Sequence, residues 1–254
     1  MQTVLSTVIL LFLLGFQING VAGEPYRLSD VILYGHDDPC GHLDSGWKER
    51  YATTYPQSIA TEYFQRSTCN NDLQLVHTLV KERKNTHQCN FDDSTLVVHV
   101  RIGDVIDSQP YSAQEFLSRW RRWWNPDTNK ETWAYYVAPY EYFESALRSL
   151  LQEKRVLTRV AIVGGIHVGN NHSKSLEYVE LIKKFFQENF PAAKVETRIA
   201  IDPATNWNAA DRDLILLSHA RLLIQAQGGF GALAAHVARQ EGATILQGDL
   251  PWDE

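Results

Sequence analysis

Between residues 95 and 247, short runs of β-forming residues alternate with longer segments of helical apolar spacing. The first run, "TLVVHV" at 95–100, is rich in β-branched residues, and "RVAIVGGI" at 159–166 repeats this character. The segment "SLEYVELIKKFFQENF" at 175–190 then has the spacing of an amphipathic helix. This alternation predicts βαβ units, a parallel sheet and the α/β fold class.

The remaining segments fit the same scheme. Apolar runs such as "LVVHV" and "LLIQ" suit strands that are covered on both faces. A capping box formed by Ser112 and Glu115 predicts where one helix starts. The other expected helices lie at 58–67, 72–84, 111–124, 138–155, 209–220 and 230–240, and the other expected strands at 194–200, 221–226 and 243–247.

The first 23 residues differ from the rest. They carry no charged side chain, contain an apolar run and end in small residues, as a secretory signal peptide does. An uncleaved membrane anchor is the main alternative, because the segment is close to the ~20 residues that span a bilayer; a buried N-terminal helix is another. We therefore expect a secretory-pathway protein, in the ER or Golgi lumen or secreted, that is attached to a membrane only if this segment is retained.

The change of pattern near residue 94 predicts three parts. These are a signal peptide or anchor at 1–23, a short N-terminal region at 24–94 and an α/β domain at 95–254. Of the three cysteines, Cys69 and Cys89 are the expected pair, which leaves Cys40 unpaired; their spacing is not a zinc pattern. A net charge of −6 over 254 residues argues against a nucleic-acid partner.

The segment "HVRIGD" at 99–104 stands at the carboxyl end of the first predicted strand, where open α/β sheets bind ligands. Arg101 offers a permanent charge and a planar fork of donors that suits phosphate oxygens. Gly103 allows the backbone to approach a ligand, and Asp104 can hold the arginine in place. The alternative is an ordinary surface ion pair between Arg101 and Asp104, which contributes little.

A second candidate site lies in "LLIQAQGGFGALAAHVA" at 222–238, which reads as strand, glycine loop and helix. Gly228 and Gly229 can turn tightly, so that the free N–H groups of the helix face the loop and form an anion site. The alternative is that these glycines serve only close packing. Two phosphate-type sites in one parallel sheet suggest a diphosphate ligand.

Two further patterns have simpler explanations. Trp120, Trp123 and Trp124 fall on one face of the helix expected at 111–124, which indicates core packing more than sugar stacking. His36, Asp37 and Asp38 resemble metal ligands, but a turn rich in aspartate and glycine explains them locally. We therefore predict no metal, and keep Asp37 and Asp38 among the candidates for a general base.

Four segments, in chain order, resemble motifs of the α1,2-, α1,6- and protein O-fucosyltransferase superfamily. "HVRIGDV" is similar to its H-x-R-x-G-D motif, and "APYEYFESAL" at 138–147 to its P-x-x-Y-Y-x-x-A-L helix. "VAIVGG" follows as the next strand of that family does, and "DLILLSHARLLIQAQGGFGALAAHVA" at 213–238 resembles its late motif. The resemblance covers residues 95–247 and implies a Rossmann-like sheet of the GT-B fold.

The resemblance also implies a reaction: transfer of fucose from GDP-fucose to a glycan or glycoprotein hydroxyl, with inversion at the sugar and no metal or other cofactor. Arg101 matches the arginine that binds the donor diphosphate, with His99 and Asp104 at flanking positions. Asp211 or Asp213 lies where the family places an acidic residue near the nucleoside.

The late loop of the family closes over the phosphates, and Gly229, Phe230 and Gly231 match it. The chain departs from the family at Ile102, where a second arginine is common, and has no early G-x-G-N-Q segment. A catalytically inactive nucleotide-sugar or glycan-binding module is therefore the alternative, and a secreted adhesion domain without nucleotide affinity is another.

Overall fold

The computed structural model describes residues 28, 32, 53, 57–68, 72–83, 91–118, 124–125, 130–131, 136–166, 172–201 and 208–249. The predicted signal segment, all three cysteines and the acids Asp37 and Asp38 lie outside these residues. Over the described part of the chain, none of the helices has the length and apolar character required to cross a bilayer.

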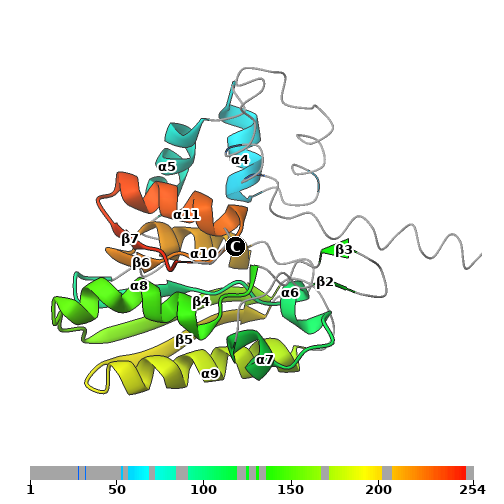
Figure 1. Cartoon of the computed structure of the whole chain (residues 1–254). Coiled ribbons are helices and arrows are strands. Elements are labelled where there is room, and N and C mark those ends of the chain that lie inside the picture. The colour runs from blue at the N-terminus through cyan, green and yellow to red at the C-terminus, as the bar shows by residue number, and fades with distance from the viewer. Residues whose placement is uncertain are drawn as a thin grey trace, which may run out of the picture.

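The sheet confirms the predicted fold class. Five parallel strands lie in the order β5-β4-β1-β6-β7, with β1 in the centre (Figure 1). Their bounds are β1 Thr95–His99, β4 Arg159–Ile166, β5 Lys194–Ile201, β6 Leu222–Ile224 and β7 Thr244–Leu246. A separate antiparallel pair is formed by β2 Trp124–Asn125 and β3 Lys130–Glu131.

Helices connect the strands, as the alternation predicts. Those of the connection from β1 to β4 are α6 Asp104–Asp107, α7 Ala113–Ser118 and α8 Tyr140–Gln152. The later connections are α9 Ser173–Asn189, α10 Asn208–Ser218 and α11 Gly229–Gln240, and α4 Ile59–Arg66 and α5 Leu73–Glu82 precede the sheet.

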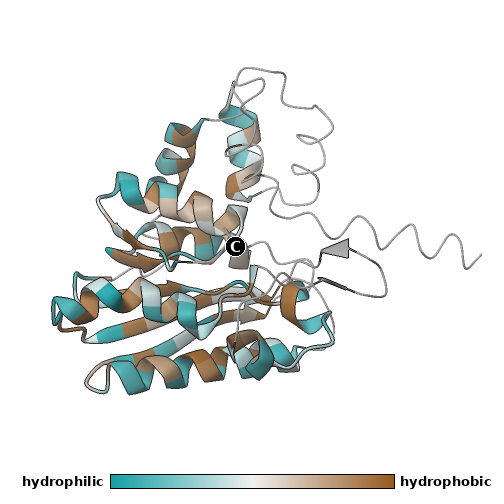
Figure 2. Ribbon diagram, in the orientation of Figure 1, coloured by the Kyte–Doolittle hydropathy of each residue, from teal (hydrophilic) through white to brown (hydrophobic). Residues whose placement is uncertain are grey.

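The alternation of side chains along β1 divides the core into two layers. Leu96 and Val98 pack with α8 and α9 on one face, whereas Val97 packs with α10 and α11 on the other. All five residues of β1 are buried, which explains why its sequence is a continuous apolar run and not an alternating one. Figure 2 shows the apolar colour concentrated in the strands and on the helix faces that meet them.

The helices α4 and α5 lie on the outer side of α10 and α11 (Figure 1). Tyr63 of α4 and Leu79 of α5 are fully buried and belong to the same apolar core as Val97 of the central strand. The described part of the region before residue 95 therefore covers the α10–α11 layer. The domain boundary near residue 94 stays a prediction.

The segment at 111–124 differs from its prediction. The capping box is confirmed, because the Glu115 N–H donates to Ser112 Oγ at 3.2 Å and the Ser112 N–H donates to the Glu115 carboxylate at 2.8 Å. However, α7 ends at Ser118 and Trp124 lies in strand β2, so the expected helix face with three tryptophans is wrong. The other two tryptophans, at positions 120 and 123, lie outside the described residues.

Candidate functional site

The order of the strands reverses between β1 and β6. The chain proceeds from β1 outward to β4 and β5, then crosses to β6 and continues outward to β7. The last pair between the two central strands is Val98 with Ile224. The ladder between β1 and β6 ends there, and the next bonds go to the outer strands: the Val100 N–H donates to Val163 O at 2.9 Å and the Gln225 N–H to Leu246 O at 3.1 Å. Such a switch point is where open α/β sheets bind ligands.

The glycine loop 228–231 starts helix α11 at this switch point. Gly228 has φ +96° and precedes the helix without a side-chain cap, so the first turn presents backbone N–H groups. Gly231 is packed tightly: a Cβ there would lie 2.4 Å from Ala226 O and 3.0 Å from His99 Nδ1. Close packing therefore explains the glycine at 231, whereas the glycines at 228 and 229 lie on the more open part of the loop.

His99 lies between the end of β1 and the first turn of α11. It is the last residue of β1, is only 5% exposed and packs its ring against that of Phe230, with 5.7 Å between the ring centroids and a tilt of 60° between the rings. Its Nδ1 has no hydrogen-bond partner and is directed at the first turn of α11. Burial, together with the charge of Arg101, lowers the pKa of His99 to about 3, so its ring is neutral at any physiological pH.

Arg101 lies two residues after His99, and its charge contributes to the lowered pKa of His99. Its neighbours Val100 and Ile102 are both buried in the α8–α9 core, whereas 26% of the Arg101 side chain is exposed. The guanidinium donates to Asp104 Oδ1 at 2.9 Å and to Ile102 O at 3.2 Å. A guanidinium has five N–H donors, so these bonds leave others for a ligand. The ion pair expected as the simpler explanation is thus formed, without excluding a phosphate.

The environment of Gly103 differs from the prediction, which is close approach of its backbone to a ligand. Its φ of +88° is a conformation that favours glycine, as the turn requires. Its N–H donates to Ser175 Oγ at the start of α9, at 2.9 Å, in a buried contact. This amide is therefore used inside the protein, and Gly103 shapes the loop instead of approaching a ligand directly.

The two acidic candidates of α10 both have partners. Asp211 Oδ2 accepts from the Ile59 N–H at 2.8 Å and from Arg83 at 3.0 Å, and burial raises its pKa to about 6. Asp213 is 2% exposed and pairs with Arg212 at 3.1 Å, and burial raises its pKa to about 7. These contacts are structural, so the role of either carboxylate near a nucleoside stays a prediction.

Sequence reasoning missed two contributors to this edge. Tyr136 lies against the glycine loop, because a Cβ at Gly228 would be 3.5 Å from its ring. Ser175 supports the turn at Gly103 from the start of α9. Neither position has a sequence signal, because each contact joins segments that only the tertiary fold brings together.

The described residues contain no group of three or more histidine, cysteine, aspartate or glutamate side chains arranged to hold a metal. The "GHDDPCGH" segment, which carried the possible metal ligands, lies outside this set. The prediction that no metal takes part is therefore left for experiment.

No family model matches the sequence, and no curated protein matches it significantly. Among solved structures, the chain is similar to an Arabidopsis thaliana FUT1 mutant in complex with GDP, with a TM-score of 0.33 and 14% sequence identity. The match covers 80% of this chain and 41% of that one, so this chain spans less than half of the plant protein. The fold assignment rests on the parallel sheet itself.

Proposed function

We propose that the edge formed by Arg101, His99 and the glycine loop 228–231 binds the diphosphate of a GDP-sugar. The protein would then be a glycosyltransferase that moves fucose from GDP-fucose to a hydroxyl of a glycan or glycoprotein, with inversion and without a metal. The sugar identity, the guanine base and the acceptor class come from the resemblance of four ordered motifs to the fucosyltransferase superfamily.

One observation supports the proposal most strongly. A cation at the end of β1 and an uncapped helix start at the end of β6 flank the single switch point of the sheet. The buried Nδ1 of His99, which lacks a hydrogen-bond partner, lies against Gly231 in the first turn of α11. A buried polar atom without a partner is costly, so it calls for an explanation, and a bound ligand supplies one.

The residues of this edge can assist the departure of GDP. In the proposed reaction an acceptor hydroxyl attacks C1 of the fucose and gives its proton to a general base, for which Asp37 and Asp38 stay candidates, while the bond from C1 to the diphosphate oxygen breaks and GDP leaves with the electron pair. Arg101 and the N-terminal end of α11 would neutralise the charge that develops on the diphosphate. His99 would add a polar contact without a charge, because its pKa of about 3 keeps the ring neutral.

Thermal unfolding with and without GDP tests the proposal. A ligand at 100 times its Kd adds ~2.7 kcal/mol to the free energy of unfolding, which gives a measurable shift of Tm. We expect a clear shift with GDP, a smaller one with GMP, and none with GDP in Arg101→Ala. Wild-type protein whose Tm does not respond to millimolar GDP would reject nucleotide binding.

A second candidate function is nucleotide-sugar or glycan binding without transfer. It is favoured by the position of α4 and α5, which cover α10 and α11 in one shared core and do not form a separate acceptor unit among the described residues. Incubation with GDP-fucose and a panel of glycan acceptors separates the two functions. Fucosylated product supports the transferase, whereas GDP affinity without transfer or donor hydrolysis supports the binding module.

A further inference from the structure

A buried serine joins the arginine-bearing loop to the start of helix α9. We refer to residues 100–107 as the arginine loop. Ser175 is fully buried, and its Oγ accepts from the Gly103 N–H at 2.9 Å while its O–H donates to Asp107 Oδ2 at 2.7 Å. Its hydroxyl therefore serves as both acceptor and donor between two points of the same loop.

Asp107, the last residue of the arginine loop, bonds to the start of α9. Its other oxygen, Oδ1, accepts from the backbone N–H of Ser175 at 3.0 Å, and only 8% of its side chain is exposed. His172 Nδ1 lies 3.8 Å from Oδ2, and Lys174 donates to Gln109 O just beyond the loop. The carboxylate thus sits at the first turn of a 17-residue helix, where its charge is favourable to the helix dipole.

Between these two points Ile102, Val105 and Ile106 are buried in the α8–α9 core, and the backbone of the loop is held by short-range hydrogen bonds and by the contact of Gly103 with Ser175. α6 is a single turn of four residues, held by bonds from the N–H groups of Ile106 and Asp107 to Gly103 O at 2.9 Å and 2.8 Å. The turn at Gly103, with φ +88° and ψ −127°, directs the chain away from Arg101 into that helix. If Gly103 shifts, the position of Arg101 shifts with it.

We propose that Ser175 and Asp107 are positioning residues that hold Arg101 at the switch point of the sheet. Neither residue contacts the ligand in this proposal; the contacts are made by Arg101. The inference deepens the proposed function, because the phosphate ligand of Arg101 rests on that function. The location of the support is new: it comes from α9, on the face of the sheet opposite to the glycine loop.

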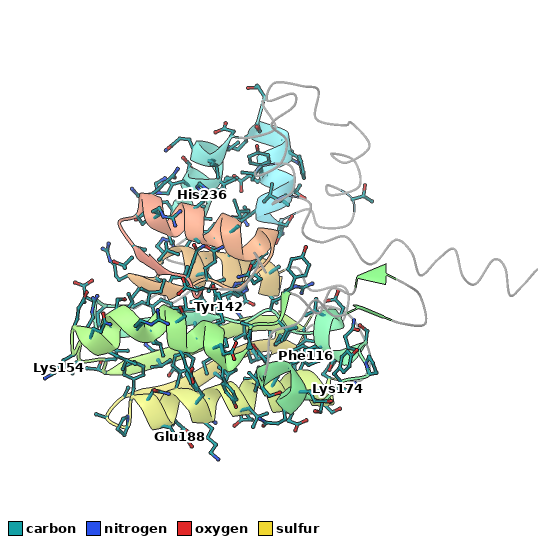
Figure 3. All side chains as sticks on the ribbon, viewed as in Figure 1. Phe116, Tyr142, Lys154, Lys174, Glu188 and His236 are labelled. Atoms are coloured by element: carbon teal, nitrogen blue, oxygen red, sulfur yellow. The ribbon has the colours of Figure 1, made fainter. Side chains whose placement is uncertain are left out.

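The packing of α9 separates this role from a general contribution to folding. Tyr178, Ile182 and Phe186 of α9 are buried in the α8–α9 core and anchor the helix without the hydroxyl of Ser175. Figure 3 labels Lys174 at the same end of α9, beside α6 and α7. Removal of the hydroxyl should therefore loosen the loop while the helix stays packed.

The test compares Ser175→Ala with Ser218→Ala. Ser218 is also fully buried, but its Oγ has no hydrogen-bond partner, so it controls for the same substitution without the junction. Hydrogen exchange is measured at the amides of Ile106 and Asp107, which bond to Gly103 O and not to Ser175. GDP affinity is measured on the same samples by calorimetry.

In Ser175→Ala we expect these amides to exchange about tenfold faster and GDP to bind about tenfold more weakly, the lower end of what loss of an outer supporting partner costs at metal sites. Ser218→Ala should match wild type in both measurements. Asp107→Asn, which keeps one acceptor oxygen, should fall between the two.

Each other result has a definite meaning. Unchanged exchange at Ile106 and Asp107 in Ser175→Ala would overturn the positioning role, as would faster exchange with unchanged GDP affinity. Wild type that does not bind GDP would reject the proposed function, while the exchange rates would still decide whether Ser175 holds the loop. If Ser175→Ala and Asp107→Asn both fail to fold, the junction is a folding requirement and the positioning role is rejected.

Discussion

The carboxylate of Asp211, in the first turn of α10, accepts the backbone N–H of Ile59, the first residue of α4, at 2.8 Å. Arg83, at the end of α5, donates to the same oxygen at 3.0 Å. The Asp211 side chain of α10 therefore bonds to both helices, α4 and α5, that precede the sheet in the sequence.

Replacement of Asp211 should weaken the attachment of α4 and α5 to α10. Asp211→Ala leaves the Ile59 N–H and one donor of Arg83 unpaired in a site where the carboxylate is 15% exposed, so we expect a loss of about 2–3 kcal/mol of unfolding free energy. Urea denaturation measures it. As control, Glu180→Ala removes an exposed pair with Lys183 and should cost less than about 0.5 kcal/mol. Equal values for both variants would contradict the anchoring role.

Asp213 should make stability depend on pH. Burial raises its pKa in the folded protein to about 7, above the ~3.9 of an unfolded chain, so the folded state binds the proton more tightly. The stabilisation is complete below about pH 4 and is lost as the pH rises toward 7. Relative to Asp213→Asn, wild type should thus lose stability between pH 4.5 and pH 7.5.

Thermal unfolding of both proteins across that range measures the effect. The exposed Asp93→Asn serves as control and should follow the wild-type curve. A constant difference in Tm between wild type and Asp213→Asn at all pH values would show that this carboxyl does not titrate in the window. Asp211, with its pKa raised by burial to about 6, adds a change of the same sign over a narrower range.

Two glycines of the same loop should respond differently. Gly231→Ala places a Cβ 2.4 Å from Ala226 O, which is backbone and cannot yield, so we expect a loss of about 3 kcal/mol of stability. Gly229→Val, at the first residue of α11, should leave the protein folded but weaken GDP binding, because the side chain obstructs the helix N–H groups. Denaturation and calorimetry on both variants separate the effects, and a folded Gly229→Val with wild-type GDP affinity would restrict the loop to packing.

Arg101 should not be replaceable by lysine. A phosphate bound by the planar fork loses its paired contacts when the fork becomes a point charge, so Arg101→Lys should bind GDP nearly as weakly as Arg101→Ala. Affinity is measured by calorimetry at fixed salt. Normal affinity in the lysine variant would remove Arg101 from the site.

Activity should persist after metal removal. Arg101 and the start of α11 are proposed to supply the positive charge that many nucleotide-sugar enzymes take from a cation. Transfer from GDP-fucose should therefore be unchanged in excess EDTA. If chelation abolishes activity and Mn²⁺ or Mg²⁺ restores it, the proposed mechanism is wrong.

The elements of the sheet could be predicted because their patterns are long and local. β1 and β4 are continuous apolar runs, and α9 has 17 residues of amphipathic spacing. By contrast, α6 is one turn and too short to show any period. Trp124 has no local signal that separates a strand of two residues from the end of a tryptophan-rich helix.

The candidate site could be predicted in part. The positions of Arg101 and the glycine loop follow from the rule that ligands lie at the carboxyl ends of parallel strands. The sequence does not show which glycines face a ligand and which are required by close packing, because both roles exclude a side chain in the same way. The sequence assigns Gly231 and Gly103 to the ligand, whereas in the structure Gly231 packs against Ala226 and the Gly103 N–H donates to Ser175.

The pairing of Leu96 with Leu222 joins strands that are half the chain apart. During synthesis β1, β4 and β5 emerge first and can assemble with α8 and α9, whereas β6, α11 and β7 emerge last. Long-range parallel pairing of this kind is slow, because the loop between the strands must close before any bond forms. Until that closure, one edge of β1 has no neighbouring strand, so a ribosome-bound or truncated chain would expose the unpaired backbone groups of that edge to chaperones and would carry Arg101 without the glycine loop.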